Sequence, residues 1–211
     1  MMLDNSPTTP IFARALGDHW QKLAPAVKGH YDLSPCSDDE LVLKGEMSVY
    51  YPRPAFFLLG MARLFGGLVL LREDNISVQV KNSSLLDSGA IFWHRTFNVP
   101  GRKQPVMFRS QMEYAGGDEI VEYVGSSPRM KLGVRMKISE NEGALNFQSV
   151  GYTLRIGFIE MPIPGHFFLG RALITERAVG INEISMDFSI KHPLFGKIYS
   201  YRGRFFLPDT V

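Results

Sequence analysis

The chain has 211 residues, of which 45% are apolar and 21% charged, so its composition is that of a globular protein rather than a disordered one. Its 23 basic and 21 acidic side chains nearly cancel, which gives no reason to expect nucleic acid or an anionic surface as a partner. The single cysteine, Cys36, excludes an internal disulfide and a cysteine metal cluster, and a reducing, cytoplasmic compartment is therefore expected.

The N-terminal sequence "MMLDNSPTTP" contains an acid and lacks an apolar core segment, so it does not resemble a secretory signal. We expect residues 1–10 to be a flexible start. The length of the chain fits one β-rich domain, and a single domain over residues 1–211 is expected.

Two helices are predicted in the first third of the chain. Residues 11–28 carry apolar side chains close to one stripe, with Pro10 before them and Gly29 after them. The second apolar segment, residues 54–71, is about as long as a minimal membrane span, but Arg63 and a double glycine interrupt it. We interpret it as a buried helix followed by a turn and a strand. The alternatives are an apolar lid and a membrane-surface contact.

Strands dominate the rest of the chain, and about ten are predicted in all. They are expected at residues 41–51, 76–81, 90–99, two within 105–125 joined at Gly116–Gly117–Asp118, 130–138, 144–159, 172–180, 183–192 and 198–207. The segment "MPIPGHFFLG", residues 161–170, interrupts them as a short helix or lid. Such a run predicts an α+β, β-rich fold. We expect one antiparallel β-barrel or strongly curved half-barrel, with the two N-terminal helices over a mouth or one face.

Charged side chains interrupt four of these apolar strands. Arg95 shares a strand face with Trp93 and Phe97, and Glu122 lies between two aliphatic residues. Arg109 and Glu176 occupy comparable positions in "VMFRSQM" and "ALITERAV". Because an unpaired buried charge costs several kcal/mol, any of these side chains that points inward should pair with another of them or line a wet cavity.

Three interpretations of Arg95 stay open at this point. It pairs with Glu122 or Glu176 and fixes strand register, or it orients the polar head of a ligand together with one glutamate. In the third interpretation it faces solvent. His166 in "PIPGHFFLG" is either a loop histidine near the barrel rim or an acid, base or hydrogen-bond donor at the mouth of a pocket.

The sequence lacks a glycine-rich phosphate loop, a nucleophile elbow and a pair of histidines at zinc-ligand spacing, so no cofactor and no metal are predicted. Barrels of this size leave room for one small ligand. The leading hypothesis is therefore the binding of a small hydrophobic or lipid-like molecule with a polar or acidic head. The expected walls are Trp93, Phe97, Met130, Met136 and Phe147, with Arg95 and Glu122 or Glu176 at the head.

Four segments together resemble a bacterial family that is catalogued as domain of unknown function 4166. They are "ALGDHWQKLAPAVKGHY", "WHRTF", "MPIPGHFFLG" and "HPLFGKIYSYRGRF", and the resemblance extends from about Leu16 to Phe206. The family pattern includes positions that match Trp93, Arg95, Phe97, Glu122, Pro162, Pro164, Glu176, His192, Pro193, Leu194, Tyr201 and Gly203.

Members of that family occur alone or joined to nucleotide-binding domains that look like saccharopine dehydrogenase. The resemblance therefore implies a second class of function, an interaction subunit of a dehydrogenase-like partner, whose own cofactor is not expected here. A third class is an enzyme in which Glu122 or Glu176 is a general base and Arg95 stabilises negative charge.

Overall fold

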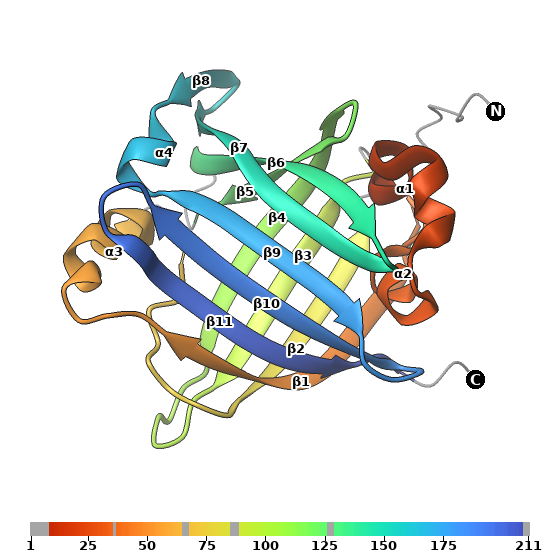
Figure 1. The fold of residues 1–211 in the computed structure, drawn as a ribbon, viewed down its shortest axis with the longest axis horizontal. Helices are drawn as coiled ribbons and strands as arrows, with labels where there is room; N and C mark the ends of the chain where they lie inside the picture. The colour runs from red at the N-terminus through yellow and green to blue at the C-terminus, as the bar shows by residue number, and fades with distance from the viewer. Residues whose placement is uncertain (1–8, 36, 65–67, 85–88, 126–128, 209–211) are drawn as a thin grey trace.

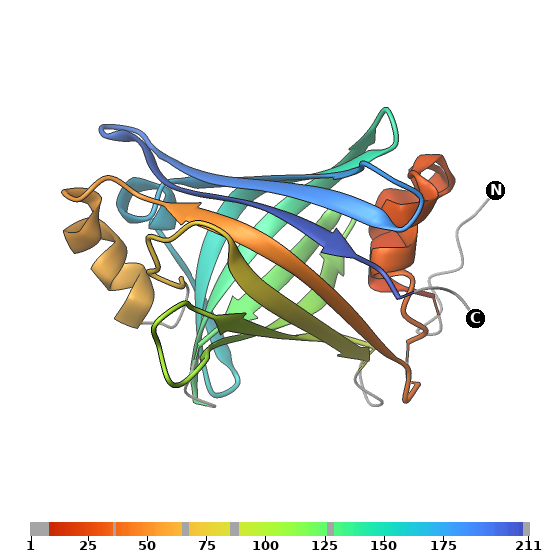
Figure 2. The ribbon, with the colours of Figure 1, turned by 90° about the horizontal axis from the view of Figure 1, so that it is seen from below.

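The computed structural model describes residues 9–208 apart from 36, 65–67, 85–88 and 126–128, and it is a closed antiparallel β-barrel with short helices at both ends (Figures 1 and 2). The predicted flexible start falls almost wholly outside the described residues. The strands are β1 (Glu40–Tyr50), β2 (Ile76–Ser84), β3 (Ile91–Asn98), β4 (Val106–Gly116), β5 (Glu119–Val124), β6 (Met130–Asn141), β7 (Ala144–Ile156), β8 (Ile159–Ile163), β9 (Arg171–Ala178), β10 (Glu183–His192) and β11 (Gly196–Phe206).

Ten of these strands close the barrel, which confirms the predicted fold class and strand number. Strands β1 to β7 pair in chain order, β7 pairs with β9, and β9 to β11 pair in order again. Antiparallel pairing of β11 with β1 then closes the ring. The remaining strand, β8, pairs with the second half of β7 and lies outside the barrel. It occupies part of the segment that the sequence predicted only as an interruption.

The predicted N-terminal helix is divided into three short pieces. They are α1 (Ile11–Leu16), a 3₁₀ helix over Gly17–Lys22 and α2 (Pro25–Tyr31). Gly17 ends α1 with a φ of 62°, which glycine adopts without strain, and Pro25 is the first residue of α2. The apolar sides of α1 and α2 are buried, and both helices lie at one end of the barrel (Figure 2).

Two further helices, α3 (Ala55–Leu64) and α4 (Gly165–Phe168), lie at the opposite end (Figure 1). The interpretation of residues 54–71 as a buried helix and a strand is only partly right. Ala55 and Leu59 are buried, but the Phe57 side chain is 86% exposed, and residues 68–71 form no strand. A helix at the rim of a barrel has protein on one side only, which explains the exposed side. The double glycine lies outside the described residues. Within the described part, no helix is long and apolar enough to cross a membrane.

Strand alternation determines which side chains fill the barrel. Trp93 and Phe97 are buried in the interior, as the alternation of β3 predicted. In β4 the inward positions are Phe108, Ser110 and Met112, because these side chains contact the core or are buried. Arg109 therefore points out of the barrel.

Candidate functional site

A cavity of about 130 Å³ lies inside the barrel, and its lining is mainly aliphatic and aromatic. Its walls include Trp93, Phe97, Met136 and Phe147, all four of which were predicted as walls. The fifth predicted wall residue, Met130, is exposed at the start of β6 and does not line the cavity. An apolar cavity with few polar groups is the usual form of a small-molecule site in proteins.

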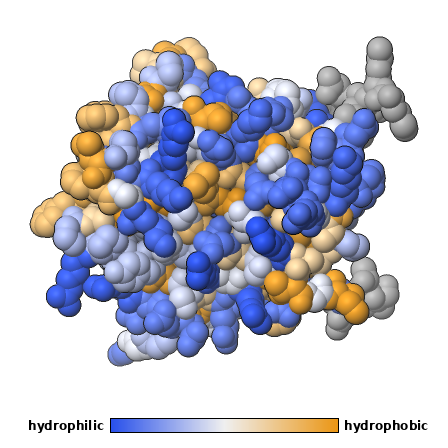
Figure 3. Space-filling view, in the orientation of Figure 1, coloured by the Kyte–Doolittle hydropathy of each residue, from blue (hydrophilic) through white to orange (hydrophobic). Residues whose placement is uncertain are grey.

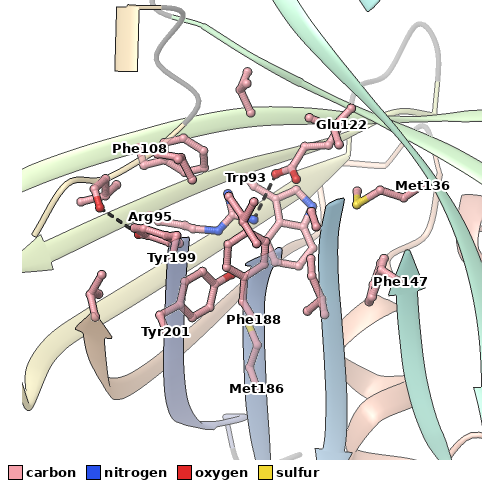
Figure 4. Close-up of a pocket in the computed structure, with 18 of the residues that line it drawn as sticks. Trp93, Arg95, Phe108, Glu122, Met136, Phe147, Met186, Phe188, Tyr199 and Tyr201 are labelled. Carbon is pink, nitrogen blue, oxygen red and sulfur yellow. Dashed lines mark hydrogen bonds and ion pairs between the residues drawn. The ribbon is translucent and has the colours of Figure 1, made fainter. Parts of the chain in front are cut away.

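Arg95 points into this cavity from β3, and Figure 4 shows it beside Trp93 and directed toward Glu122 on β5. Its Nη2 lies 3.3 Å from Glu122 Oε1, and its Nη1 donates to Ser110 Oγ at 3.0 Å. The guanidinium carbon also lies 4.8 Å from the centroid of the Trp93 ring. The solvent-facing interpretation of Arg95 is therefore wrong. The side chain makes one loose ion pair and packs on aromatic faces.

Glu176 lies on β9 with a fully buried side chain that is 0% exposed. It is not paired with Arg95. His30 Nδ1 lies 3.0 Å from its Oε2, and the Tyr31 hydroxyl donates to its Oε1 at 2.6 Å. Burial, and then the charge and hydrogen bond of Glu176, raise the pKa of Tyr31 well above its ordinary value, so the phenol keeps its proton and donates. The pair of contacts ties α2 to the barrel wall.

Two ring nitrogens of cavity-lining residues have no hydrogen-bond partner among the described residues. They are Nε1 of Trp93 and Nε2 of His30, both buried, and the two rings meet edge to face with their centroids 5.1 Å apart. Because Glu176 binds Nδ1 of His30, the unpartnered Nε2 is the atom left to meet a bound molecule or water.

The remaining predicted site residues lie outside the cavity wall. Arg109 is exposed on the outer surface of β4, because Phe108 and Ser110 on either side of it take the inward positions. His166 lies on α4, where its Nε2–H donates to the carbonyl oxygen of Ser149 at 3.2 Å. Phe168 at the end of α4 and Leu169 directly after it line the cavity, so His166 is close to the rim without facing the interior.

Sequence reasoning missed His30 and Tyr31. The sequence nevertheless contained a signal for their burial. His30 and Tyr31 lie three and four residues after Val27, so both continue the apolar stripe of the helix. Gly29 was interpreted as the end of the helix, whereas α2 continues through it to Tyr31.

Comparison with known proteins agrees with the family resemblance. The model of a domain of unknown function (DUF4166) matches residues 23–205, and a comparison with curated proteins finds no match. The solved structure of Rv2717c from M. tuberculosis has a TM-score of 0.49 and 9% identity, covering 88% of this chain and 99% of that chain. The outer membrane protein Omp33 of Acinetobacter baumannii has a TM-score of 0.23 and 10% identity, covering 80% of this chain and 97% of that chain. Neither likeness is close enough to transfer a site.

Proposed function

This chain belongs to the DUF4166 family of domains of unknown function, and we propose that its barrel binds a small hydrophobic molecule with a polar or acidic head. The aliphatic and aromatic lining of the cavity suits the apolar part of such a molecule. The polar side chains of the lining, among them His30, Arg95 and Glu122, suit the head of the molecule. They come from separate elements and face the same cavity.

The observation that carries the proposal is the pair of unpartnered nitrogens on Trp93 and His30. A buried polar atom without a partner costs about 1–3 kcal/mol, so a protein that keeps two of them beside a cavity gains when a ligand or an ordered water supplies the partner. In a purely structural core, apolar residues of the same shape would avoid this cost.

Arg95 supplies the preference for an acidic head. A guanidinium has five N–H donors, and Ser110 and Glu122 take one each, which leaves donors for a ligand carboxylate. Glu122 competes with that carboxylate for the same cation. Arg95 therefore favours the binding of an anionic ligand and Glu122 opposes it. Removal of either charge should change the affinity in opposite directions, which can be tested.

The test is a titration with anilinonaphthalene sulfonate, a fluorescent apolar molecule with an anionic head. Arg95→Met is expected to weaken binding about tenfold or more, because one charged hydrogen bond contributes about 1.5–3 kcal/mol. Glu122→Gln is expected to strengthen binding, because it removes the competing carboxylate. Arg109→Met removes an equal charge from the outer face of the neighbouring strand and is the matched control.

If Glu122→Gln and Arg95→Met weaken binding alike, or if Arg109→Met matches Arg95→Met, the pair is structural and the proposal is wrong. A second test is native mass spectrometry of the purified protein, which gives the mass of any natural ligand. The expected result is that this ligand is absent from Arg95→Met, whose fold is retained by circular dichroism.

A second candidate function is proton transfer on the same molecule, and the contact between Glu176 and His30 favours it. A carboxylate that accepts a hydrogen bond from Nδ1–H leaves Nε2 able to accept a proton from a ligand. In that case His30→Gln abolishes turnover of the natural ligand while circular dichroism shows that the fold is retained. Turnover that survives His30→Gln excludes this role.

A further inference from the structure

We propose that the end of the barrel where α3 and α4 lie docks on the surface of a bilayer that contains anionic lipids. The inference rests on exposed side chains and not on the cavity, so it stands or falls separately from the proposed function. Neither Arg95 nor His30 enters the argument, and Phe168 is the one tip residue that also lines the cavity.

Four exposed apolar side chains form what we call the apolar tip: Phe167 and Phe168 on α4, and Leu194 and Phe195 in the turn between β10 and β11. Phe167, Leu194 and Phe195 are 61%, 71% and 67% exposed. His192 holds the two segments together, because its Nε2–H donates to the carbonyl oxygen of Phe167 at 2.8 Å and its ring lies 4.9 Å from the Phe195 ring. The apolar tip is therefore built into the fold.

Further apolar side chains lie at the same end. They come from α3 and from β8 with the turn before it, namely Phe56, Phe57, Phe158, Ile159 and Met161. Figure 3 shows apolar side chains gathered at the left, over α3 and α4, and at the top, over β8. Single exposed apolar residues are ordinary, but several elements that present them at one end mark an interaction surface.

Cations border the apolar tip. Arg171, Lys191 and Lys197 stand directly opposite one another on β9, β10 and β11, all exposed, and none forms an ion pair with a described residue. Like charges that face each other across strands are destabilising, so this row favours a bound anionic surface. The net charge of the whole chain is small and gives no indication of this row of cations. At the α1–α2 end, by contrast, the exposed cations Arg135, Lys137 and Arg204 pair with the acidic residues Glu119, Asp118 and Glu183.

The charge and shape together favour a bilayer over a protein. Short apolar projections from separate elements enter the boundary between head groups and acyl chains, while a row of cations beside them contacts anionic head groups. Phe168 also lines the cavity, so the apolar tip is continuous with the cavity wall and would bring the barrel mouth to the lipid. A molecule taken up there would leave the bilayer without crossing water.

The experiment is flotation of the protein with vesicles of phosphatidylcholine alone or of an equimolar mixture of phosphatidylcholine and phosphatidylglycerol. Wild type is expected to float with the mixed vesicles and to be released by salt. Lys191→Gln with Lys197→Gln is expected to weaken binding about fivefold per charge, because a cation near an anionic surface contributes about 1 kcal/mol. Leu194→Ser with Phe195→Ser is expected to weaken it about tenfold or more.

The matched controls lie at the other end of the barrel. Ile181→Ser replaces a side chain that is 92% exposed in the turn between β9 and β10, and Arg177→Gln removes a cation from the far end of β9. Both are expected to leave flotation unchanged. Arg95→Met is also expected to leave it unchanged, which separates docking from cavity binding.

A spectroscopic readout tests the orientation. Tryptophan emission of Phe195→Trp is expected to shift to shorter wavelength on addition of the mixed vesicles, and emission of Ile181→Trp is expected to stay unchanged. Trp20 and Trp93 are buried and give a constant background. Absence of flotation, flotation that the tip and cation variants do not alter, or a shift at residue 181 instead of 195 would each overturn the proposal. Absence of flotation would leave this surface to a protein partner.

Discussion

Replacement of Glu176 by alanine should destabilise the protein strongly, because this carboxylate is the buried link between α2 and the barrel. It accepts a hydrogen bond from Tyr31 at 2.6 Å and lies 3.0 Å from Nδ1 of His30. Hydrogen bonds to a charged group contribute about 1.5–3 kcal/mol each, and loss of one partner from a buried polar pair costs about 3–5 kcal/mol. We therefore expect Glu176→Ala to lower the free energy of unfolding by about 3–5 kcal/mol.

Urea denaturation followed by circular dichroism measures this loss. Tyr31→Phe removes one of the two contacts and should cost about 2 kcal/mol, and the double variant should cost less than the sum because the two changes share one bond. Arg177→Ala, the exposed neighbour on the same strand, is the control and should stay within about 0.5 kcal/mol of wild type. A cost below about 1 kcal/mol for Glu176→Ala, or additive costs for the pair, would refute the assignment of Glu176 as the link.

Two further predictions concern β1 and the outer face. Gly45→Ala should cost about 2 kcal/mol or more in urea denaturation, because a β-carbon there would overlap the carbonyl oxygen of Arg204 on β11; an unchanged midpoint would contradict this. Burial first, and then the nearby charges of Arg109 and Lys81, lower the pKa of His94. Protonation of His94 thus favours the unfolded chain, so its contribution to stability is complete above about pH 6.5 and is lost as the pH falls through the lower folded value. Arg109→Met should raise the pKa of His94 in an NMR titration, and an unchanged value would exclude the charge effect.

The barrel could be predicted from the sequence because each strand carries its own alternation and most neighbours in the barrel are also neighbours along the chain. Two of the three interpretations of Arg95 placed it inward because it shares a strand face with Trp93 and Phe97, and both of these residues are buried. Strand alternation did not give the direction of Arg109. Met107 lies on the same face of β4 and is apolar, yet it is exposed. Alternation alone therefore gave no clear inward face at that position.

The pairing of charges could not be predicted, because it depends on which strands meet across the interior. Glu122 and Glu176 were equivalent partners of Arg95 in the sequence, yet Glu176 contacts His30 and Tyr31 from the closing helix α2. The row of cations beside the apolar tip was hidden for a similar reason. Arg171 lies on β9, Lys191 on β10 and Lys197 on β11, so the three residues are not adjacent in the sequence. Only the register between these strands brings them opposite one another.

The pairing of β11 with β1 has a consequence for how the chain folds. Every other pairing in the barrel joins strands that are consecutive or separated only by β8 and α4, so hairpins can form as the chain lengthens. The ring itself stays open until the residues of β11 are made. Until then β1 and β10 both present free edges, which are sites for pairing with other chains. A chain interrupted before Gly196 is thus expected to aggregate rather than to form a smaller barrel, and closure is expected to limit the folding rate.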